Sequence, residues 1–261
     1  MIISNITQNN KVNNPNFGNI QKKVFKPTGN GFHIKEFSHN CDTAVFRTDM
    51  NWKLLGNKIF NMFKDCPNVA TYFYGCSNCS EVYTLIMQLA TDYDENFIEK
   101  LSPIIAKDND LNIVMDARSD YLPLSLEEVK IIQKQTGRQF LRFFEEKCEY
   151  DNNSYYFKPK PILKDNVKIG LADIRTDYKN IQKQNSIISA RNFWVYLPEQ
   201  DREILAQNLY NHLEGNNLLI LGHHDYRDWE RNSPYNAINL LKKAGFKETE
   251  IPYVLIKEKQ D

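Results

Sequence analysis

The sequence predicts an α/β fold in which helices pack against a buried sheet. Short apolar runs of strand length alternate with longer segments whose apolar residues recur every three or four positions. The clearest case is Val69–Tyr74, an apolar and aromatic run followed by a helical pattern from Glu81. Such alternation is typical of domains whose sheet is covered by helices. The 261 residues suffice for one large domain or two small ones.

Charge and composition exclude several classes of partner. Basic and acidic residues number 33 each, so net charge gives no reason to expect binding to nucleic acid or a membrane surface. No apolar run approaches the roughly 20 residues of a membrane span, and the N-terminal sequence lacks a signal-peptide pattern. Five cysteines without framework spacing suit a reducing compartment. We expect a cytoplasmic protein, and a monomer.

The chain is expected to begin with a polar segment. Residues 1–40 carry few apolar side chains, and residues 1–30 show no regular period, so we expect them to be flexible and dispensable for folding. The first predicted helix spans Asp49–Lys64, with Asp49 as its N-cap. The folded domain is expected to occupy residues 41–261.

Two helices and a second strand are predicted next. The helices span Glu81–Asp92 and Asn96–Ala106, and the strand Leu111–Met115 ends at Asp116. An acidic residue at the carboxyl end of such a strand commonly binds ribose hydroxyls. Asp116 lies farther beyond Gly75 than the roughly 20 residues of the dinucleotide pattern. That spacing argues against a dinucleotide fold and leaves room for another adenosyl cofactor.

A small β excursion follows in the pattern. Ser125-Leu-Glu-Glu128 has the form of a capping box that opens a helix ending near Gln135, and Phe140–Phe144 continues as a short helix. Glu149–Leu163 carries an asparagine-rich turn between aromatic runs and is predicted to form a hairpin. We expect a small β insertion over about residues 146–165.

The C-terminal half continues the alternation. Three more strands are predicted, at Val167–Leu171, Ser186–Ser189 and Leu218–Leu221. A helix over Glu199–Leu213 precedes Gly215, which suits a left-handed cap, and a last helix is expected between Ser233-Pro234 and Gly245. Two terminal antiparallel strands are expected, at Glu248–Ile251 and Tyr253–Lys257.

A turn of small residues separates the first strand from the helix at Glu81. Its members are Gly75, Cys76, Ser77, Asn78, Cys79 and Ser80. A strand, such a turn and a helix N-terminus together direct backbone N–H groups toward a ligand. An ordinary turn stays open as the alternative, because glycine-rich fingerprints are weak evidence. Cys76 and Cys79 form a C-x-x-C without a second pair at zinc-finger spacing, so we expect small turn residues and no metal.

Strings of residues in this order resemble the CheR family of chemotaxis-receptor methyltransferases. Thr43-Ala-Val-Phe-Arg47 resembles the family's T-x-F-F-R, with Cys41 where an asparagine is usual. Gly75-Cys-Ser-Asn-Cys-Ser-Glu81-Val-Tyr-Thr resembles G-C-S-T-G-E-E-P-Y-S. Cys79 replaces the inner glycine of that string, and Ser80 replaces its first glutamate.

The resemblance continues to the last strand of the pattern. Asp116 is matched to the first aspartate of A-T-D-I-D, with Arg118 at the second. Val167-Lys-Ile-Gly-Leu-Ala-Asp173-Ile174 resembles V-x-F-x-x-x-N-L, with aspartate for asparagine. Ser189-Ala-Arg191-Asn192-Phe193-Trp-Val-Tyr196-Leu resembles F-C-R-N-V-L-I-Y-F. Leu213-Glu-Gly-Asn-Asn-Leu-Leu-Ile-Leu-Gly222-His223 resembles L-x-P-G-G-x-L-x-L-G-H.

This resemblance implies a Rossmann-like class I methyltransferase fold that uses S-adenosylmethionine (SAM), with helices on both faces of the sheet. It implies S-adenosylhomocysteine as product and a protein glutamate, such as one on a chemoreceptor, as methyl acceptor. The implied cofactor-binding residues are Thr43, Arg47, Gly75, Glu81, Asp116, Asp173, Ile174, Asn192 and Phe193. The family usually carries an N-terminal helical domain, whereas about 40 polar residues precede Thr43 here.

Arg47 and Tyr196 are the candidate catalytic residues. A glutamate acceptor is ionised at neutral pH, since its ordinary pKa is about 4.3, so the reaction needs placement more than a base. Arg47 can hold the acceptor carboxylate or that of the methionine moiety, and Tyr196 can orient the acceptor. Alternatively, Arg47 is a surface ion-pair partner, Tyr196 an aromatic at the core edge and Asn192 a turn residue.

Three functions stay open at this point. The leading one is methylation of a protein carboxylate. The second is a non-catalytic SAM-binding or interaction protein, motivated by Cys79, Ser80 and the short N-terminal segment. The third is methylation of a small molecule, because a fold does not fix the substrate.

Overall fold

The computed structural model describes residues 43–151, 154–226 and 233–259. Predictions about residues 1–40, and the substitution at Cys41, lie outside the described residues. Within the described ranges, no helix is long and apolar enough to cross a membrane.

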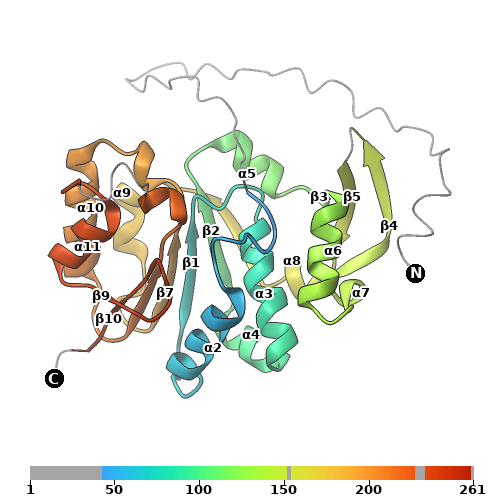
Figure 1. The fold of residues 1–261 in the computed structure, drawn as a ribbon, viewed down its shortest axis with the longest axis horizontal. Coiled ribbons are helices and arrows are strands. Elements are labelled where there is room, and N and C mark those ends of the chain that lie inside the picture. Colours follow the sequence, from blue (N-terminus) through green and yellow to red (C-terminus); the bar gives the residue numbers. More distant parts are fainter. Residues whose placement is uncertain (1–42, 152–153, 227–232, 260–261) are drawn as a thin grey trace. The chain divides into compact units, whose positions relative to one another are not determined.

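A seven-stranded sheet with the order β6-β2-β1-β7-β8-β10-β9 organises the fold (Figure 1). Its strands are β1 Ala70–Tyr74, β2 Ile104–Asp108, β6 Val167–Leu171, β7 Ser186–Ala190, β8 Asn217–Ile220, β9 Lys247–Glu248 and β10 Val254–Lys257. The strands from β6 to β8 in this order are parallel, while β10 runs antiparallel to β8 and β9. From β1 the chain adds strands first on one side, as β2 and β6, and then on the other, beginning with β7. In open α/β sheets, ligands generally bind at the carboxyl ends of the strands at such a switch point.

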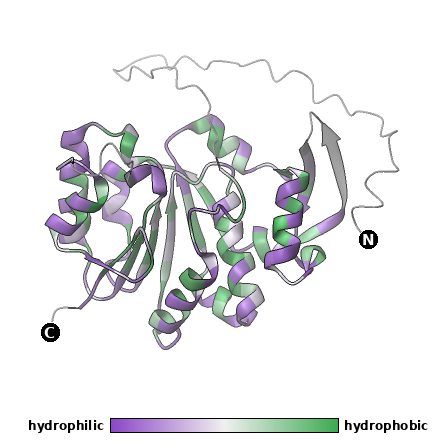
Figure 2. Ribbon diagram, viewed as in Figure 1, coloured by the Kyte–Doolittle hydropathy of each residue, from purple (hydrophilic) through white to green (hydrophobic). Residues whose placement is uncertain are grey.

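Helices cover both faces of this sheet, as expected (Figure 1). One face carries α2 Trp52–Phe63, α3 Ser80–Asp92 and α4 Glu95–Leu101, and the other carries α10 Glu199–His212 and α11 Ala237–Ala244. On the α10 side, Leu205 and Leu209 belong to one buried cluster with Tyr72, Ile188 and Leu219 of the strands. α10 carries both hydrophilic and hydrophobic residues (Figure 2). Glu203 and Gln207 are exposed, whereas Leu205 and Leu209 are buried, so only one side of the helix packs against the sheet.

The second strand lies earlier than predicted. Residues 104–108 form β2, whereas Leu111–Ala117 form the helix α5, so the predicted strand at Leu111–Met115 is wrong. Asp110 caps α5 by accepting a hydrogen bond from Asn112 N at 2.8 Å. α4 ends at Leu101 because Pro103 lacks the N–H that a continuing helix would need. The apolar run that the strand prediction used therefore belongs to a helix, and it leaves Met115 exposed.

A three-stranded sheet is inserted between α5 and β6. It has the order β3-β5-β4, with β3 Leu122–Leu124, β4 Phe144–Asp151 and β5 Ser154–Pro159. The predicted hairpin is present as β4 and β5, and β3 adds a strand that the pattern did not indicate. The helices α6 Leu126–Gln135, α7 Phe140–Phe143 and α8 Pro161–Lys164 complete this insertion, and α6 opens with the predicted capping box.

The C-terminal elements follow the prediction except at the start of the last helix and at the strand predicted over Glu248–Ile251, of which only Glu248 lies in β9. α9 Ile174–Asp177 and the short helices η1 Tyr178–Asn180, η2 Trp194–Tyr196 and η3 His223–Tyr226 connect the strands. α11 begins at Ala237, not at Ser233-Pro234, because the Asn236 side chain accepts from Ile238 N and caps the helix there. Gly245 ends α11 with a φ of +122°, as predicted.

Candidate functional site

The predicted site residues come from loops that follow β1, β6 and β7. Gly75 follows β1, Asp173 and Ile174 follow β6, and Asn192 and Phe193 follow β7. β1 is hydrogen-bonded to β2 on one side and to β7 on the other, and all three strands are parallel. These loops therefore open on the same edge of the sheet, at the switch point of the strand order.

The turn after β1 has left-handed backbone both at Gly75 and at Cys79, which stands where the family pattern has a glycine. Gly75 has a φ of +68°, and a Cβ at this position would lie 3.2 Å from Phe193 Cδ1. Cys79 adopts a φ of +69° at the N-cap of α3, and its N–H donates to Cys76 O at 2.9 Å. A left-handed conformation costs roughly 1–2 kcal/mol in a residue with a Cβ. The cysteine thus carries strain that glycine would not.

The two thiols of this turn are buried and paired with each other. A hydrogen bond with Cys79, together with burial, raises the pKa of the Cys76 thiol well above its ordinary value. A protonated, buried thiol is a poor nucleophile and a poor metal ligand. Among the described residues, no group of three His, Cys, Asp or Glu side chains is arranged to hold a metal ion.

Asp108, rather than Asp116, stands at the carboxyl end of the second strand. Asp108 Oδ2 accepts from Ser77 N at 3.1 Å and Oδ1 accepts from Asp110 N at 3.1 Å, so this carboxylate joins β2 to the turn after β1. Burial raises its pKa. Asp116 is exposed on α5, so its predicted place at a strand end is wrong. The string AKDND over residues 106–110 has the alanine and both aspartates of A-T-D-I-D, and this signal identifies Asp108.

Four charged side chains, which we call the charge cluster, meet beside this turn. They are Arg47, Asp49, Glu81 and Arg191. Arg191 is 2 % exposed, and its Nη2 and Nη1 lie 2.9 Å from Asp49 Oδ1 and Glu81 Oε2 respectively. Arg47 Nε lies 3.7 Å from Asp49 and 3.8 Å from Glu81. The cluster is electrically balanced, with two cations and two anions.

Burial and the two arginines act in opposite directions on the pKa values of the two acids, with a different outcome at each. Burial disfavours a charged Asp49, but Arg191 and Arg47 outweigh it and lower the pKa of this carboxyl. Burial prevails at Glu81 and raises its pKa, although both arginines oppose it. The sequence prediction assigned no role to Arg191 and made Asp49 a helix cap. The cap of α2 is Asn51, whose side chain accepts from Leu54 N at 3.1 Å, so that prediction is wrong.

Asp173 is held by its own loop. Its carboxylate caps α9 by accepting a hydrogen bond from Arg175 N at 2.9 Å. The same carboxylate also forms an ion pair with the Arg175 guanidinium. Arg175 in turn reaches Asp201 at 2.8 Å, at the start of α10. Burial raises the pKa of Asp173, but these contacts with Arg175 prevail and lower it. The loop after β6 therefore presents a fixed carboxylate, followed by the buried Ile174.

The remaining predicted residues lie around the same edge. Asn192 has a φ of +62°, and its Oδ1 accepts from His224 N at 3.2 Å. Tyr196 is 69 % exposed on η2, so it is not an aromatic at the core edge and its ring is accessible to a large partner. Thr43, at the start of the described chain, is half-buried.

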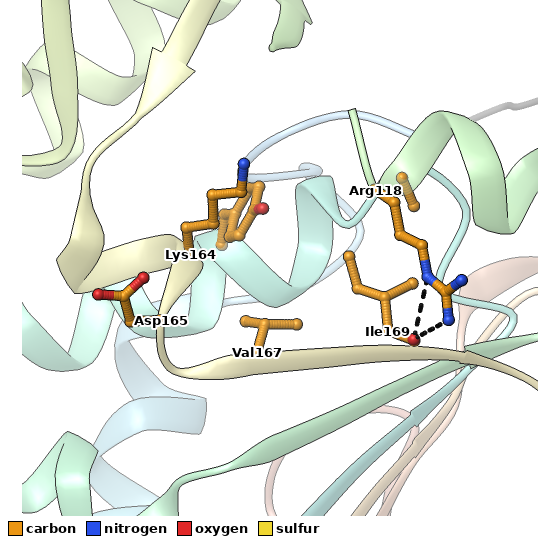
Figure 3. A pocket seen from close by; sticks show the side chains of 7 residues that line it. Arg118, Lys164, Asp165, Val167 and Ile169 are labelled. Carbon is orange, nitrogen blue, oxygen red and sulfur yellow. Dashed lines mark hydrogen bonds between the residues drawn. The ribbon is translucent and has the colours of Figure 1, made fainter. Parts of the chain in front are cut away.

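A hollow of about 330 Å³ lies beside β6 (Figure 3), and none of the predicted site residues lines it. Val167 and Ile169 form its floor, and Arg118 and Lys164 stand at its rim. Arg118 donates to Ile169 O from Nη2 at 2.7 Å, and Lys164 pairs with Asp120. Both cations are thus engaged within the protein. Arg118, matched by the sequence to a ribose-binding motif, instead covers the free edge of the sheet.

The residues at the carboxyl edge fit SAM. Its methionine moiety carries an ammonium and a carboxylate, and the charge cluster offers partners of both signs. Ser77 Oγ is buried in the turn without a hydrogen-bond partner among the described residues, and no side chain caps α3 at Cys79. Asp108 and Asp173 supply acceptors at two neighbouring strand ends, where ribose hydroxyls and an adenine amino group require them.

Comparisons with known proteins agree with this chemistry. The family model described as "CheR methyltransferase, SAM binding domain" matches residues 41–240. A chemotaxis protein methyltransferase of Borreliella burgdorferi is 25% identical over 209 residues, which are 77% of this chain and 70% of that protein.

Solved structures of other methyltransferases match more distantly. The magnesium protoporphyrin IX methyltransferase of Synechocystis PCC 6803 with bound SAM has a TM-score of 0.38 at 12% identity, over 78% of this chain and 75% of its own. A TehB-like SAM-dependent methyltransferase of Corynebacterium glutamicum has a TM-score of 0.38 at 9% identity, over 78% and 87%. The assignment to a family therefore rests on the match to the family model and not on these structures.

Proposed function

The chain belongs to the CheR methyltransferase family, and on this premise we propose that it methylates a glutamate carboxylate of a protein. The family establishes a SAM-dependent methyltransferase. The name of the Borreliella burgdorferi relative, a chemotaxis protein methyltransferase, supports an acceptor in a chemosensory pathway. The observation that carries the proposal is the charge cluster, in which the buried Arg191 pairs with the half-buried Asp49 and Glu81 beside the turn after β1.

The cofactor side of the site is proposed as follows. Glu81 and Arg191 hold the methionine end, and Asp108 accepts from the ribose hydroxyls. Asp173 and Ile174 face the adenine, while Asn192 and Phe193 close the site from β7. Thr43 and Gly75 contribute from the two ends of this arrangement, as the family resemblance implies. SAM, when bound, supplies a methyl group made electrophilic by its sulfonium sulfur.

The acceptor side is proposed to use Arg47 and Tyr196. Arg47 pairs with the incoming carboxylate and places one oxygen in line with the methyl carbon. A carbon–oxygen bond forms as the carbon–sulfur bond breaks, and the electron pair of the broken bond stays on sulfur. No proton is transferred, because the acceptor is already ionised with an ordinary pKa of about 4.3. Tyr196, exposed on η2, orients the acceptor chain.

The non-catalytic alternative was motivated by the loss of the turn glycine. Cys79 nevertheless adopts a positive φ of +69°, close to the +68° of Gly75. A residue with a Cβ thus occupies this left-handed position, which supports a working cofactor site over a decayed one.

The test uses the lability of a methyl ester. The protein is incubated with SAM labelled with tritium in the methyl group and with a chemoreceptor signalling fragment that carries glutamates. A carboxylate product releases volatile methanol in mild base, whereas N-methyl products do not. We expect base-labile label in the fragment. Label that is stable to base, or label only on small molecules, would refute a protein carboxylate as acceptor.

Two variants separate binding from chemistry. Glu81→Gln should weaken S-adenosylhomocysteine binding by about tenfold to a hundredfold, because a charge-assisted hydrogen bond contributes roughly 1.5–3 kcal/mol. Arg47→Ala should retain most of this affinity and abolish methyl transfer. If calorimetry shows that Arg47→Ala loses affinity as fully as Glu81→Gln, Arg47 binds the cofactor and its acceptor role fails.

A further inference from the structure

We propose that Asp225 is a positioning residue of this site, which holds the loop after β7 so that Asn192 and Phe193 face the cofactor. This inference rests on the proposed function in one respect only, the identity of the ligand. The hold on the loop can be measured without any ligand.

Asp225 joins two loops through three backbone donors. It is 1 % exposed, and its Oδ2 accepts from Asn192 N at 2.6 Å and from Gly222 N at 2.9 Å. Its Oδ1 accepts from Trp194 N at 2.9 Å. Asn192 and Trp194 belong to the loop after β7, and Gly222 to the loop after β8. One carboxylate thus fixes the carboxyl ends of both strands relative to each other.

The contact is reciprocal at Asn192. Its Oδ1 accepts from His224 N at 3.2 Å, and a Cβ at Gly222 would lie only 1.9 Å from this oxygen. The Asn192 side chain therefore lies directly against the backbone of the second loop, which requires glycine at position 222. With its Oδ1 engaged, the Asn192 Nδ2 has no partner among the described residues and can donate to a ligand.

Phe193 is fixed from both sides by the same carboxylate. The N–H groups of the residues before and after it, Asn192 and Trp194, both donate to Asp225. Phe193 Cδ1 lies 3.2 Å from the position of a Cβ on Gly75, so its ring covers the turn after β1. Trp194 also begins η2, the helix that carries Tyr196. Movement of Asp225 would consequently reach both the cofactor and the acceptor side.

An amide cannot replace this carboxylate. Three N–H donors converge on two oxygens, and asparagine offers one oxygen and one donating nitrogen. Whichever way the amide of Asp225→Asn is turned, Asn192 N or Trp194 N faces an NH₂ group. Burial raises the pKa of Asp225 to about 7, although the three N–H donors and Arg191 act to lower it. The fold retains an acid here although its burial is unfavourable.

Asn217 provides a matched control at the opposite ends of the same strands. It is also 1 % exposed, and its Oδ1 accepts from Ser186 N at 3.0 Å while its Nδ2 donates to Glu214 O at 2.8 Å. It joins β7 to β8 as Asp225 does, but no predicted site residue adjoins it. Asn217→Ala therefore reports the effect of a lost junction on stability alone.

The experiment compares the full-length wild type, Asp225→Asn and Asn217→Ala at pH 8, where Asp225, with a pKa of about 7, is ionised. Thermal unfolding gives stability, and calorimetry well below the melting temperature gives the Kd of S-adenosylhomocysteine. Amide hydrogen exchange by NMR without ligand reports on Asn192 and Trp194. We expect both variants to melt lower. Asp225→Asn alone should raise Kd by about tenfold and speed exchange at Asn192 or Trp194 by about tenfold, as for one lost hydrogen bond.

The kinetics of methyl transfer add a measurement that a loss of stability alone does not change. Asp225→Asn should raise the KM for SAM and lower kcat, since it loosens Asn192 and η2 together, whereas Asn217→Ala should leave both unchanged. If Asp225→Asn does not fold, Asp225→Glu keeps both oxygens one methylene farther out and should show the same effects in weaker form.

The outcomes separate the two claims. If the wild type does not bind S-adenosylhomocysteine, the proposed function fails, and amide exchange still decides whether Asp225 holds the loop. If Asp225→Asn melts lower but keeps the wild-type Kd and the wild-type exchange at both amides, Asp225 supports the fold and does not position the site.

Discussion

The strands β7 and β8 are joined at both ends by a buried polar side chain, and the two junctions differ in kind. At the amino ends, Asn217 makes neutral hydrogen bonds to backbone groups such as Ser186 N. At the carboxyl ends, Asp225 buries a carboxylate near Arg191, and Asn192 adopts a left-handed backbone. Both junctions hold the same two strands. Asn185, next to the amino junction, also has a positive φ of +52°, so the buried charge is what distinguishes the carboxyl junction.

The difference shows where this fold tolerates unfavourable features. A neutral, fully hydrogen-bonded side chain is sufficient to align two parallel strands. Buried titratable groups and positive φ at residues with a Cβ cost free energy, and they are commonest where function requires them. The carboxyl edge gathers Asp108, Glu81, Arg191, Cys79 and Asn192, which all have one of these features. This concentration marks the edge as the functional one.

The largest effect is expected from removing the buried arginine. Arg191→Met leaves Asp49 and Glu81 without their closest cation and should destabilise the protein by about 3–5 kcal/mol. The amino edge offers the control: Lys183 pairs with Glu214 at 2.9 Å, but both side chains are more than half exposed. Lys183→Met should cost under about 1 kcal/mol. Equal losses in urea unfolding would show that the charge cluster is no more than a surface network.

A pH dependence is expected from Asp225. Its pKa is about 7 in the folded protein, above the ordinary 3.8, so its contribution to stability is full below about pH 4 and is lost as pH rises through 7. Between pH 5.5 and 8, the stability of the wild type relative to Asp225→Asn should fall by about 2 kcal/mol. Arg191, His223 and His224 are present in both proteins. A difference in urea unfolding that does not vary with pH, or that grows, would contradict a raised pKa.

The smallest effect comes from two glycines that share a φ of +68°, Gly75 at the carboxyl edge and Gly215 at the amino edge. Alanine at either position should cost about 1–2 kcal/mol of stability, because both adopt the left-handed conformation. A Cβ at Gly75 would press on the Phe193 ring, whereas one at Gly215 would meet the exposed side chain of Gln184. Only Gly75→Ala should weaken S-adenosylhomocysteine binding in calorimetry. Equal affinities for both variants would place the cofactor away from this turn.

Much of the fold was predictable because its signals are local. The apolar runs of β1 and β7, the capping box at Ser125 and the glycine cap at Gly245 each depend on a few adjacent residues. The second strand was missed because Leu111–Met115 is as apolar as a strand, while the actual strand, Ile104–Asp108, ends in two charged residues. Only pairing with β1 and β6 distinguishes the two.

Site residues could be predicted where a sequence motif fixed their position. They could not be predicted where their role depends on partners that are distant in the sequence. Gly75, Asp173 and Asn192 were located by their strings, and each does follow a strand of the sheet. Asp49 was expected to cap a helix, since its partner Arg191 lies 142 positions away and no local pattern joins them. Asp225 was passed over for the same reason, because its donors come from two loops.

The central claim is that Asp108, and not Asp116, contacts the ribose of the cofactor, and ligand affinity tests it most directly. S-adenosylhomocysteine is titrated calorimetrically into the wild type, Asp108→Asn and Asp116→Asn. We expect the wild type to bind, Asp108→Asn to lose about tenfold or more in affinity, and Asp116→Asn to stay within about twofold, since a lost charge-assisted hydrogen bond contributes roughly 1.5–3 kcal/mol. A larger loss for Asp116→Asn than for Asp108→Asn, or no binding by the wild type, would contradict a cofactor site at the carboxyl ends of these strands.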